Sequence, residues 1–253
     1  MAELLLVLGA DRLFYRGPPV EGGAHRHHAL QIAASLGAPL QLCGDDGRAQ
    51  EGMGALVAAD ARHRLLGGAP KLALLYLEPE GATAQALVRQ RRLTDVPLQT
   101  CTPAPELSAR LAGFGADEDF DALCTDWLAA LGVAAAAPAP AMDARVATVL
   151  AYLRAHPEQR HAAAAPAERG GLSAHRLMHL FREGTGLPLR RYALWLRLRT
   201  AVAAALKGAS LTAAAHAAGF SDSAHLSRSF REHFGLPPRF LFESRGRLTV
   251  RFR

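Results

Sequence analysis

The chain has 253 residues, 50% of them hydrophobic, which allows two domains with a core each and excludes a disordered or fibrous protein. No apolar run reaches the roughly 18 to 20 residues that cross a bilayer, so we expect a soluble, cytoplasmic protein. Cys43, Cys101 and Cys124 form no CxxC pair, so we expect neither a disulfide framework nor a zinc ribbon. The net charge of +6 is uneven: residues 143–253 hold 18 Lys and Arg against 7 Asp and Glu, whereas residues 1–142 hold 11 against 16. Such asymmetry is expected when only one part of a chain meets a polyanion.

Residues 4–77 are typical of an antiparallel β-domain. Short apolar stretches such as LLLVLG, PLQLCG and KLALLYLEPEG follow one another here. Gly, Pro or Asp separates them at intervals of about ten residues, which predicts a sandwich or a barrel of short strands.

Two amphipathic helices are predicted next, at residues 106–114 and 120–131. Leu107, Leu111 and Phe114 recur at spacings of three and four positions, which is the period of a helix face. The following stretch, VAAAAPAPA, has nothing to bury and has the composition of a linker. We therefore divide the chain into an amino-terminal domain at residues 1–132, a linker at 133–142 and a helical domain at 143–253.

The helical domain carries a capping residue before each predicted helix. Asp143 can cap a first helix that stops before Pro157. Pro188 lies near the start of a long helix that reaches Leu206. The other candidate caps are Ser173, Ser210 and either Ser221 or Asp222.

Two stretches of this domain are copies of one another. LMHLFREGTGLP (177–188) and LSRSFREHFGLP (226–237) align without gaps at an offset of 49 residues. Each copy follows a short Ala-rich segment and a glycine turn, and the small residues Ala167, Ala214 and Ala215 would let two helices cross closely. This is the arrangement of a helix-turn-helix motif, present twice.

The outward residues of each copy are the candidates for contact with double-stranded DNA, because a major groove admits one α-helix whose exposed side chains reach base edges. A helix from Pro188 to Leu206, about 28 Å long, could hold both copies on one side of a duplex whose major-groove faces recur at roughly 34 Å. The candidates are Ser173, Ala174, His175, Arg176, His179 and Arg182 in the first copy, and Asp222, Ser223, His225, Ser227, Arg228 and Arg231 in the second.

Residues 143–245 resemble the DNA-binding domain of the AraC/XylS family. The diagnostic stretch is AAAHAAGFSDSAHLSRSFREHFGLPPRFL (213–241), and YALWLRLRTA (192–201) is similar to the helix that links the two motifs in that family. The resemblance implies a transcription regulator, an activator or a repressor, whose amino-terminal domain is a cupin-like sensor for a small-molecule effector. It also implies RNA polymerase as a partner and allows a homodimer.

The sequence departs from the family pattern in the first copy. Pro166 falls inside the first short helix, where the family usually has larger apolar residues, and Ala214 stands where a branched residue is usual. We therefore expect the first copy to contribute no more to specificity than the second.

His25, His27, Gln31 and His63 have a spacing that resembles a cupin site. Three imidazoles and an amide oxygen could hold a divalent ion such as iron, zinc or nickel. Metal cupins commonly carry Glu at the place of Gln31, which favours an effector pocket lined by these four residues, without a cofactor, over a metal site. We expect the three histidines to converge, because alternate residues of a strand share a face.

The predicted fold class is thus α+β in two domains: a sandwich or cupin-like barrel with two appended helices, then an all-α tandem helix-turn-helix. These features fit a ligand-responsive transcription regulator best, and we do not expect the protein to be an enzyme. A metal-dependent cupin oxygenase fused to a DNA-binding domain would instead show tight stoichiometric iron and turnover. An architectural DNA-binding protein would show no saturable small-molecule binding by residues 1–132. A redox role for one cysteine stays open.

Overall fold

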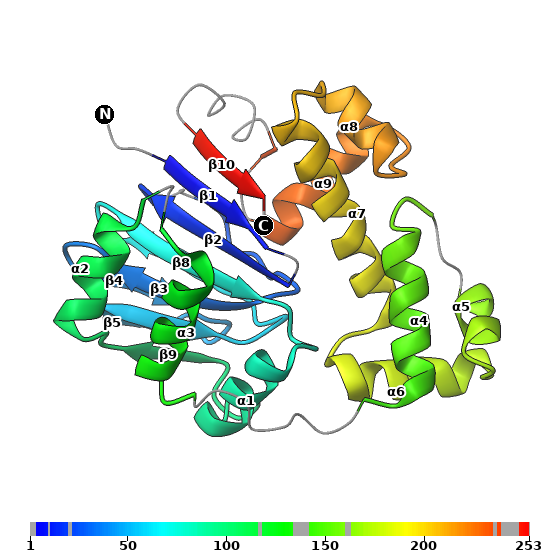
Figure 1. The fold of residues 1–253 in the computed structure, drawn as a ribbon, viewed down its shortest axis with the longest axis horizontal. Coiled ribbons are helices and arrows are strands. Elements are labelled where there is room, and N and C mark those ends of the chain that lie inside the picture. The colour runs from blue at the N-terminus through cyan, green and yellow to red at the C-terminus, as the bar shows by residue number, and fades with distance from the viewer. Residues whose placement is uncertain are drawn as a thin grey trace. The chain divides into compact units, whose positions relative to one another are not determined.

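The computed structural model describes residues 4–9, 11–19, 22–115, 118–133, 142–159, 163–234, 237–238 and 248–252. They form two compact units (Figure 1). The first falls within residues 1–139, 234–236 and 244–253, and the second within residues 140–233 and 237–243. A sheet-rich unit and a helical unit, as predicted, are therefore present.

The first unit contains two β-sheets. The larger has the strand order β10-β1-β2-β8-β3-β6-β9, and the smaller has the order β5-β4-β7. The described strands form these two sheets and close no barrel. The predicted barrel and its cupin-like fold are therefore not confirmed. The strands are Leu4–Leu8 (β1), Arg12–Gly17 (β2), Leu30–Ser35 (β3), Leu40–Cys43 (β4), Ala49–Gly52 (β5), Gly54–Val57 (β6), Arg64–Gly67 (β7), Leu72–Leu77 (β8), Leu98–Cys101 (β9) and Leu248–Phe252 (β10).

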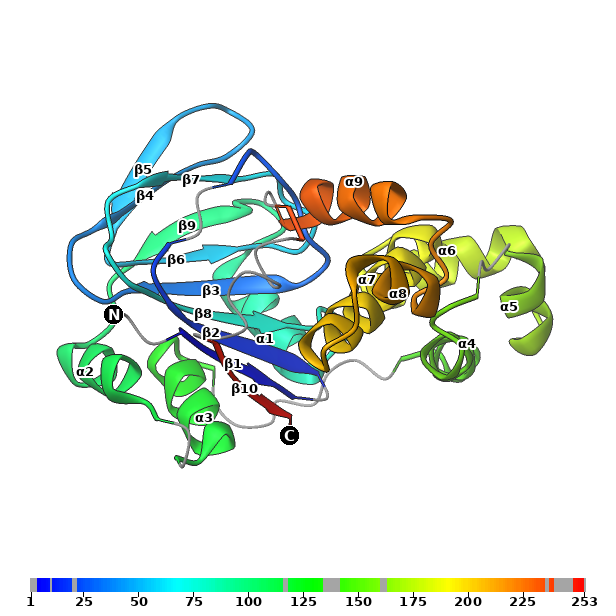
Figure 2. The same cartoon turned by 90° about the horizontal axis from the view of Figure 1, so that it is seen from above.

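Apolar side chains cover both faces of the larger sheet. On β3, Ile32 belongs to the core beneath the helices, whereas Ala33 belongs to a second core shared with Leu40 and Leu42 of the smaller sheet. Figure 2 shows the smaller sheet on one side of the larger one and α2 and α3 on the other. Because alternate residues of a strand share a face, Gln31 lies on the same face as Ala33, toward the smaller sheet.

Three helices belong to the first unit: Ala82–Arg91 (α1), Pro105–Gly113 (α2) and Phe120–Ala130 (α3). The two predicted helices correspond to α2 and α3. Their aromatic residues surround Phe14 of β2, whose ring centroid lies 5.4 Å from that of Phe114, 6.2 Å from that of Phe120 and 6.4 Å from that of Trp127. These contacts fix the helices on the sheet.

Among the described residues, no helix is long and apolar enough to cross a membrane.

Strand β10 is an element that the sequence analysis does not anticipate. It pairs in parallel with β1, with Leu248 opposite Leu4 and Phe252 opposite Leu8 (Figure 1). The carboxyl-terminal residues of the chain thus complete the sheet that its amino-terminal residues begin. The chain leaves the first unit, forms the helical unit and returns.

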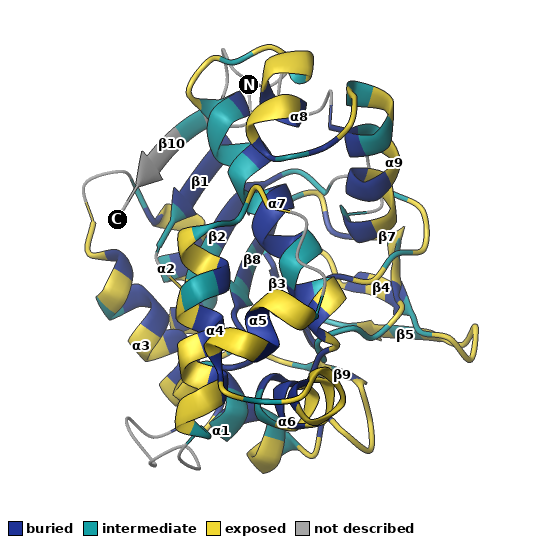
Figure 3. Ribbon diagram, turned by 90° about the vertical axis from the view of Figure 1, so that its right-hand side faces the viewer, coloured by how far each residue is buried: buried dark blue, intermediate teal, exposed yellow. Residues whose placement is uncertain are grey.

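The second unit consists of six described helices: Ala144–Ala155 (α4), Ala164–Arg169 (α5), Ala174–Thr185 (α6), Leu189–Leu206 (α7), Leu211–Ala217 (α8) and Ser223–Phe234 (α9). Buried and exposed residues alternate along α4, α6 and α9 (Figure 3). The predicted caps are confirmed: the side chains of Asp143, Ser173 and Ser210 accept backbone N–H groups of the first turns. Asp222, and not Ser221, caps α9, since its Oδ1 lies 2.6 Å from the backbone nitrogen of His225.

Pro166 does not prevent the formation of α5. It is buried in the first turn of a helix that begins at Ala164. Backbone N–H groups in a first turn have no partner within the helix, so a proline there costs no hydrogen bond. The first motif therefore has its supporting helix.

Candidate functional site

The second unit contains two pairs of helices with the same turn between them. We call α5 and α6 the first head, and α8 and α9 the second head. Leu172 donates its backbone N–H to Ala167 at 2.9 Å, and Phe220 donates to Ala215 at 2.9 Å. Each turn contains one glycine in the left-handed region, Gly171 at φ 61° and Gly219 at φ 71°. The first helices thus correspond at an offset of 48 residues and the second helices at 49, because the second turn is one residue longer.

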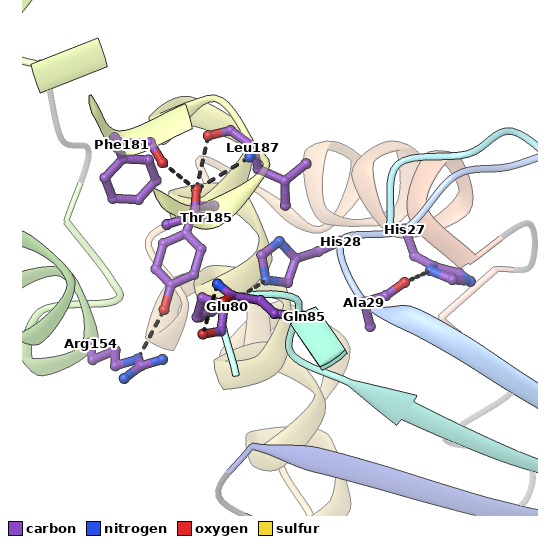
Figure 4. A network of polar contacts seen from close by, with 10 residues as sticks. His27, His28, Ala29, Glu80, Gln85, Arg154, Phe181, Thr185 and Leu187 are labelled. Atoms are coloured by element: carbon purple, nitrogen blue, oxygen red, sulfur yellow. Dashed lines mark hydrogen bonds and ion pairs between the residues drawn. The ribbon is translucent and has the colours of Figure 1, made fainter. Parts of the chain in front are cut away.

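The predicted outward residues of the first head are exposed. Leu177, Leu180 and Phe181 are buried, as predicted. The residues that the solvent reaches are Ser173, Ala174, His175, Arg176, His179 and Arg182. His179 Nδ1 lies 3.7 Å from Glu183 Oε2 on the same face. At the end of α6, the Thr185 hydroxyl donates to the carbonyl oxygen of Phe181 at 2.7 Å (Figure 4).

Met178 is a surface residue of the first head that the sequence analysis misses. Its side chain is 50% exposed on α6, between the exposed His175 and Arg182. A large apolar side chain at such a place is unusual on a basic face, and a count of apolar positions assigns it to the core. In the sequence, the only indication of this exposure is that Met178 stands between Leu177, which faces inward, and His179, which faces outward.

The second head presents a mixed polar face. Asp222, Arg228 and Arg231 are exposed, whereas Ser223, His225 and Ser227 are half-buried. Leu226 and Phe230 are buried beneath them. Both heads therefore place basic side chains outward on the helix that follows the turn.

Hydrogen bonds fix the tautomer of His225. The Ser221 hydroxyl donates to Asp222 Oδ2 at 2.9 Å, and its oxygen lies 3.1 Å from His225 Nδ1. Because the only hydroxyl hydrogen goes to a carboxylate, the Ser221 oxygen accepts a hydrogen bond from Nδ1–H. In the neutral ring, Nε2 is then an acceptor. The hydrogen bonds to Asp222 lower the pKa of its carboxyl group.

Arg197 joins the linking helix α7 to the turn of the second head. Its guanidinium donates to the carbonyl oxygens of Ala218 at 2.9 Å and Gly219 at 2.6 Å. It also lies 4.1 Å from the ring centroid of Phe220. Near the other end of the unit, Arg154 of α4 donates to the Tyr192 hydroxyl at 2.9 Å (Figure 4). These bonds tie α7 to its neighbours.

The first unit brings together the residues of the predicted effector pocket. One ring nitrogen from each of His25, His27 and His63 lies within 4.8 Å of the other two. Gln31 joins this group, since its Oε1 lies 2.8 Å from His27 Nε2. His27, Gln31 and His63 are buried. The predicted convergence of the three histidines is therefore found. We call His25, His27, Gln31 and His63 the histidine cluster.

Backbone hydrogen bonds hold the cluster in place. His25 and His63 form an antiparallel bridge, each donating its N–H to the other's carbonyl oxygen at 2.9 Å. Their ring centroids are 4.4 Å apart. Burial, and then the neighbouring imidazoles, lower the pKa of His27 well below its usual value. Burial, and then His25, lower the pKa of His63 to about 4.

His28 has a different place from the one that a strand neighbour suggests. As the neighbour of His27 along a strand, His28 is expected to lie on the outer face, but it is buried and its Nε2 lies 3.4 Å from Glu80 Oε2. Figure 4 shows His27 and His28 pointing to different partners. A buried carboxylate needs a polar partner, and the imidazole of His28 is a polar group that faces Glu80.

Two of the cysteines, Cys101 and Cys124, lie where burial disfavours the thiolate. All three are free. Burial raises the pKa of Cys124 to about 11 and also raises that of Cys101. Since the thiolate is the reactive form, these two behave as core residues.

Comparisons with known proteins concern both units. A family model described as a helix-turn-helix domain matches residues 167–244. ToxT from Vibrio cholerae is similar in fold, with a TM-score of 0.60 and 11% identity over 92% of this chain and 98% of that chain. An unsaturated fatty acid-bound ToxT gives a TM-score of 0.61 and 12% identity over 92% of this chain and 95% of that one.

A transcriptional regulator with an AraC-type DNA-binding domain, from Chromobacterium violaceum, is 27% identical over 40% of this chain and 92% of its own, with a TM-score of 0.38. No curated protein sequence matches the chain. Residues 167–244 are a helix-turn-helix domain of the AraC type.

Proposed function

We propose that the chain is a sequence-specific, DNA-binding transcription regulator whose first unit responds to a small effector. The observation that carries the proposal is the pair of heads within the matched domain, each with a basic, exposed face on the helix after its turn. The linking helix α7 has 18 residues, or about 27 Å at 1.5 Å per residue. That length suits two successive major-groove faces.

The exposed residues of the two heads divide by their chemistry. Arg176 and Arg228 are placed to read base edges, because an arginine fork matches the O6 and N7 atoms of guanine. Met178 can contact a thymine methyl group, as apolar side chains do in the major groove. Arg190 and the half-buried Arg191, at the start of α7, are better suited to phosphates. The remaining candidates, Ser173, Ala174, His175, His179, Arg182, Asp222, Ser223, Ser227 and Arg231, would position the helices.

His225 would read an amine. With Nδ1–H bound to Ser221, the neutral ring offers Nε2 as an acceptor. In the major groove, the exocyclic amines of adenine and cytosine are the donors. His225 is therefore proposed to prefer an adenine or a cytosine over a guanine.

The effector part of the proposal concerns the first unit. Solved forms of ToxT, which is similar in fold, carry an unsaturated fatty acid or a naphthalenyl butenoic acid. Here the histidine cluster is proposed as the effector site, with residues 133–142 linking sensor and DNA-binding domains. Contact with RNA polymerase, activation, self-association and a cytoplasmic location stay predictions that accompany this function.

The test is a salt-resolved binding titration of the full chain on a duplex selected by that chain from random DNA, and on a scrambled duplex. Arg228→Ala should weaken binding to the selected duplex by about 1 to 3 kcal/mol and relax the preference at one base pair. Arg190→Ala should weaken both duplexes alike and reduce the salt slope by about one unit. Equal losses on both duplexes for Arg228→Ala and His225→Ala would show that neither residue reads bases. Failure to select any sequence would favour the architectural alternative.

A second prediction tests the tautomer. Ser221→Ala should leave α9 capped by Asp222, but it frees His225 Nδ1, so the ring can turn and present a donor. We expect the discrimination between amine-bearing bases and guanine at that position to fall by about tenfold, the equivalent of 1.4 kcal/mol. Selection experiments on both proteins measure it. An unchanged base preference with unchanged helix content would remove His225 from base reading.

A further inference from the structure

We propose that the histidine cluster binds one divalent transition-metal ion through His25, His27 and His63. Three imidazoles from separate positions of the chain each bring one ring nitrogen within 4.8 Å of the other two. The inference deepens the effector part of the proposed function by naming the class of ligand. It rests on the geometry of the cluster and uses nothing from the DNA-binding heads.

The outer hydrogen bonds of the three rings match those of metal-binding histidines. His25 Nδ1 lies 3.0 Å from the carbonyl oxygen of Gly23, and His63 Nδ1 lies 3.0 Å from that of Ala61. His27 Nδ1 lies 2.7 Å from the carbonyl oxygen of Ala29 (Figure 4). A carbonyl oxygen only accepts, so Nδ1 carries the proton in all three neutral rings. Nε2 is then left with a lone pair, which is the ligand form of histidine, and a backbone partner at the other nitrogen is its usual support.

The contact between His27 and Gln31 requires either a cation or a turned Gln31 amide. Nε2 of His27, which has a lone pair, faces Oε1 of Gln31 at 2.8 Å. Two atoms that each lie about 2.1 Å from a metal ion are roughly 3.0 Å apart at a right angle and roughly 3.4 Å apart in a tetrahedron. The observed separation therefore suits two adjacent ligands of one ion. A rotated Gln31 amide, which would donate to Nε2, is the metal-free alternative, and the experiment below distinguishes the two.

The backbone holds the ligands before an ion arrives. The two hydrogen bonds between His25 and His63 set those rings opposite each other on one face. His27 follows two residues after His25, on the same face, and its carbonyl oxygen accepts the N–H of Asp60 at 2.9 Å.

Nitrogen ligands narrow the class of ion. Imidazole suits zinc, copper, iron, nickel and cobalt, whereas calcium and magnesium prefer oxygen. The described neighbourhood offers a single amide oxygen, Gln31 Oε1, and no carboxylate within the group of ligand atoms. We therefore expect zinc and cobalt(II) to bind and magnesium not to compete.

The experiment uses the full chain, stripped of metal with a chelator and dialysed. Zinc binding is measured by calorimetry, and cobalt(II) is titrated while its visible absorption is recorded. We expect one ion per chain and a cobalt spectrum with nitrogen-ligand bands. His63→Ala should weaken zinc binding by at least about 100-fold, the upper end of the cost of losing a supporting partner. The matched control is His216→Ala, an exposed histidine of α8, which should bind zinc like the unmodified chain.

Gln31→Glu keeps the proposal testable even if His63→Ala fails to fold. A carboxylate at this position should tighten zinc binding by about tenfold or more, because it adds a negative ligand beside three neutral ones. In a metal-free cluster the same substitution would only bury an extra charge and lower the melting temperature, with no rescue by zinc. Absence of stoichiometric zinc and cobalt binding in the folded, unmodified chain overturns the metal site. DNA binding is measured separately, so that result leaves the regulator proposal standing.

Discussion

Gly219→Ala should lower the free energy of unfolding of the second unit by more than about 3 kcal/mol. Gly219 has φ 71°, a conformation that costs a residue with a side chain about 1 to 2 kcal/mol. An added Cβ would also overlap the carbonyl oxygen of Glu158 and lie 2.9 Å from its carbonyl carbon. Backbone atoms cannot turn aside as a side chain can, so the segment around Glu158 would have to move.

The first head supplies the matched control. Gly171 has φ 61°, and an added Cβ there meets nothing within 4 Å. Gly171→Ala should therefore cost only the backbone strain, about 1 to 2 kcal/mol. Urea unfolding can be followed through Trp195 of α7 in a Trp127→Phe background, because the chain has two tryptophans and Trp127 lies in the first unit. Equal costs for the two substitutions would contradict the predicted overlap at Glu158.

Arg197→Ala should lower the same free energy by about 2 to 4 kcal/mol. The substitution leaves the carbonyl oxygens of Ala218 and Gly219 without the buried guanidinium that donates to them. Each lost hydrogen bond to a charged group costs about 1.5 to 3 kcal/mol. The stacking on Phe220 is lost as well. Specific DNA binding by the second head should fall with it, because the turn sets the direction of α9.

Arg197→Lys separates charge from shape. Lysine keeps the positive charge but lacks the planar fork that reaches two oxygens and stacks on a ring, so it should recover less than half of the lost stability. Arg190→Ala, an exposed arginine of the same helix, should change stability by no more than about 0.5 kcal/mol. Full recovery by lysine would mean that charge alone holds the turn.

Features that depend on neighbouring residues could be predicted from the sequence. The caps Asp143, Ser173 and Ser210 satisfy N–H groups two or three positions away, and the inward faces of α6 and α9 follow from a period of about 3.6 residues. The convergence of the histidines also follows, in part, from the alternation of residues along a strand. The roles of the site residues stay predictions.

Features that depend on distant partners could not be predicted. His28 is buried because Glu80 lies opposite it, 52 positions along the chain. Helix α1 has only Ala84 and Leu87 buried, which is too few for an amphipathic pattern. Strand β10 has five residues and finds its partner at the other end of the chain. The tautomer of His225 depends on the direction in which the Ser221 hydroxyl hydrogen points, and residue types alone do not give that direction.

The pairing of β10 with β1 bears on how the protein can be divided. A protease cut between residues 133 and 142 would break the polypeptide, yet the two pieces should co-purify for as long as this parallel pair persists. A fragment of residues 143–253 would carry Leu248, Val250 and Phe252 without the strand with which they pair in the full chain. Unpaired apolar strands promote aggregation. A domain fragment ending before β10, at residue 243, should therefore be the better-behaved one, and a tag at the carboxyl terminus would follow a strand of the first unit's sheet.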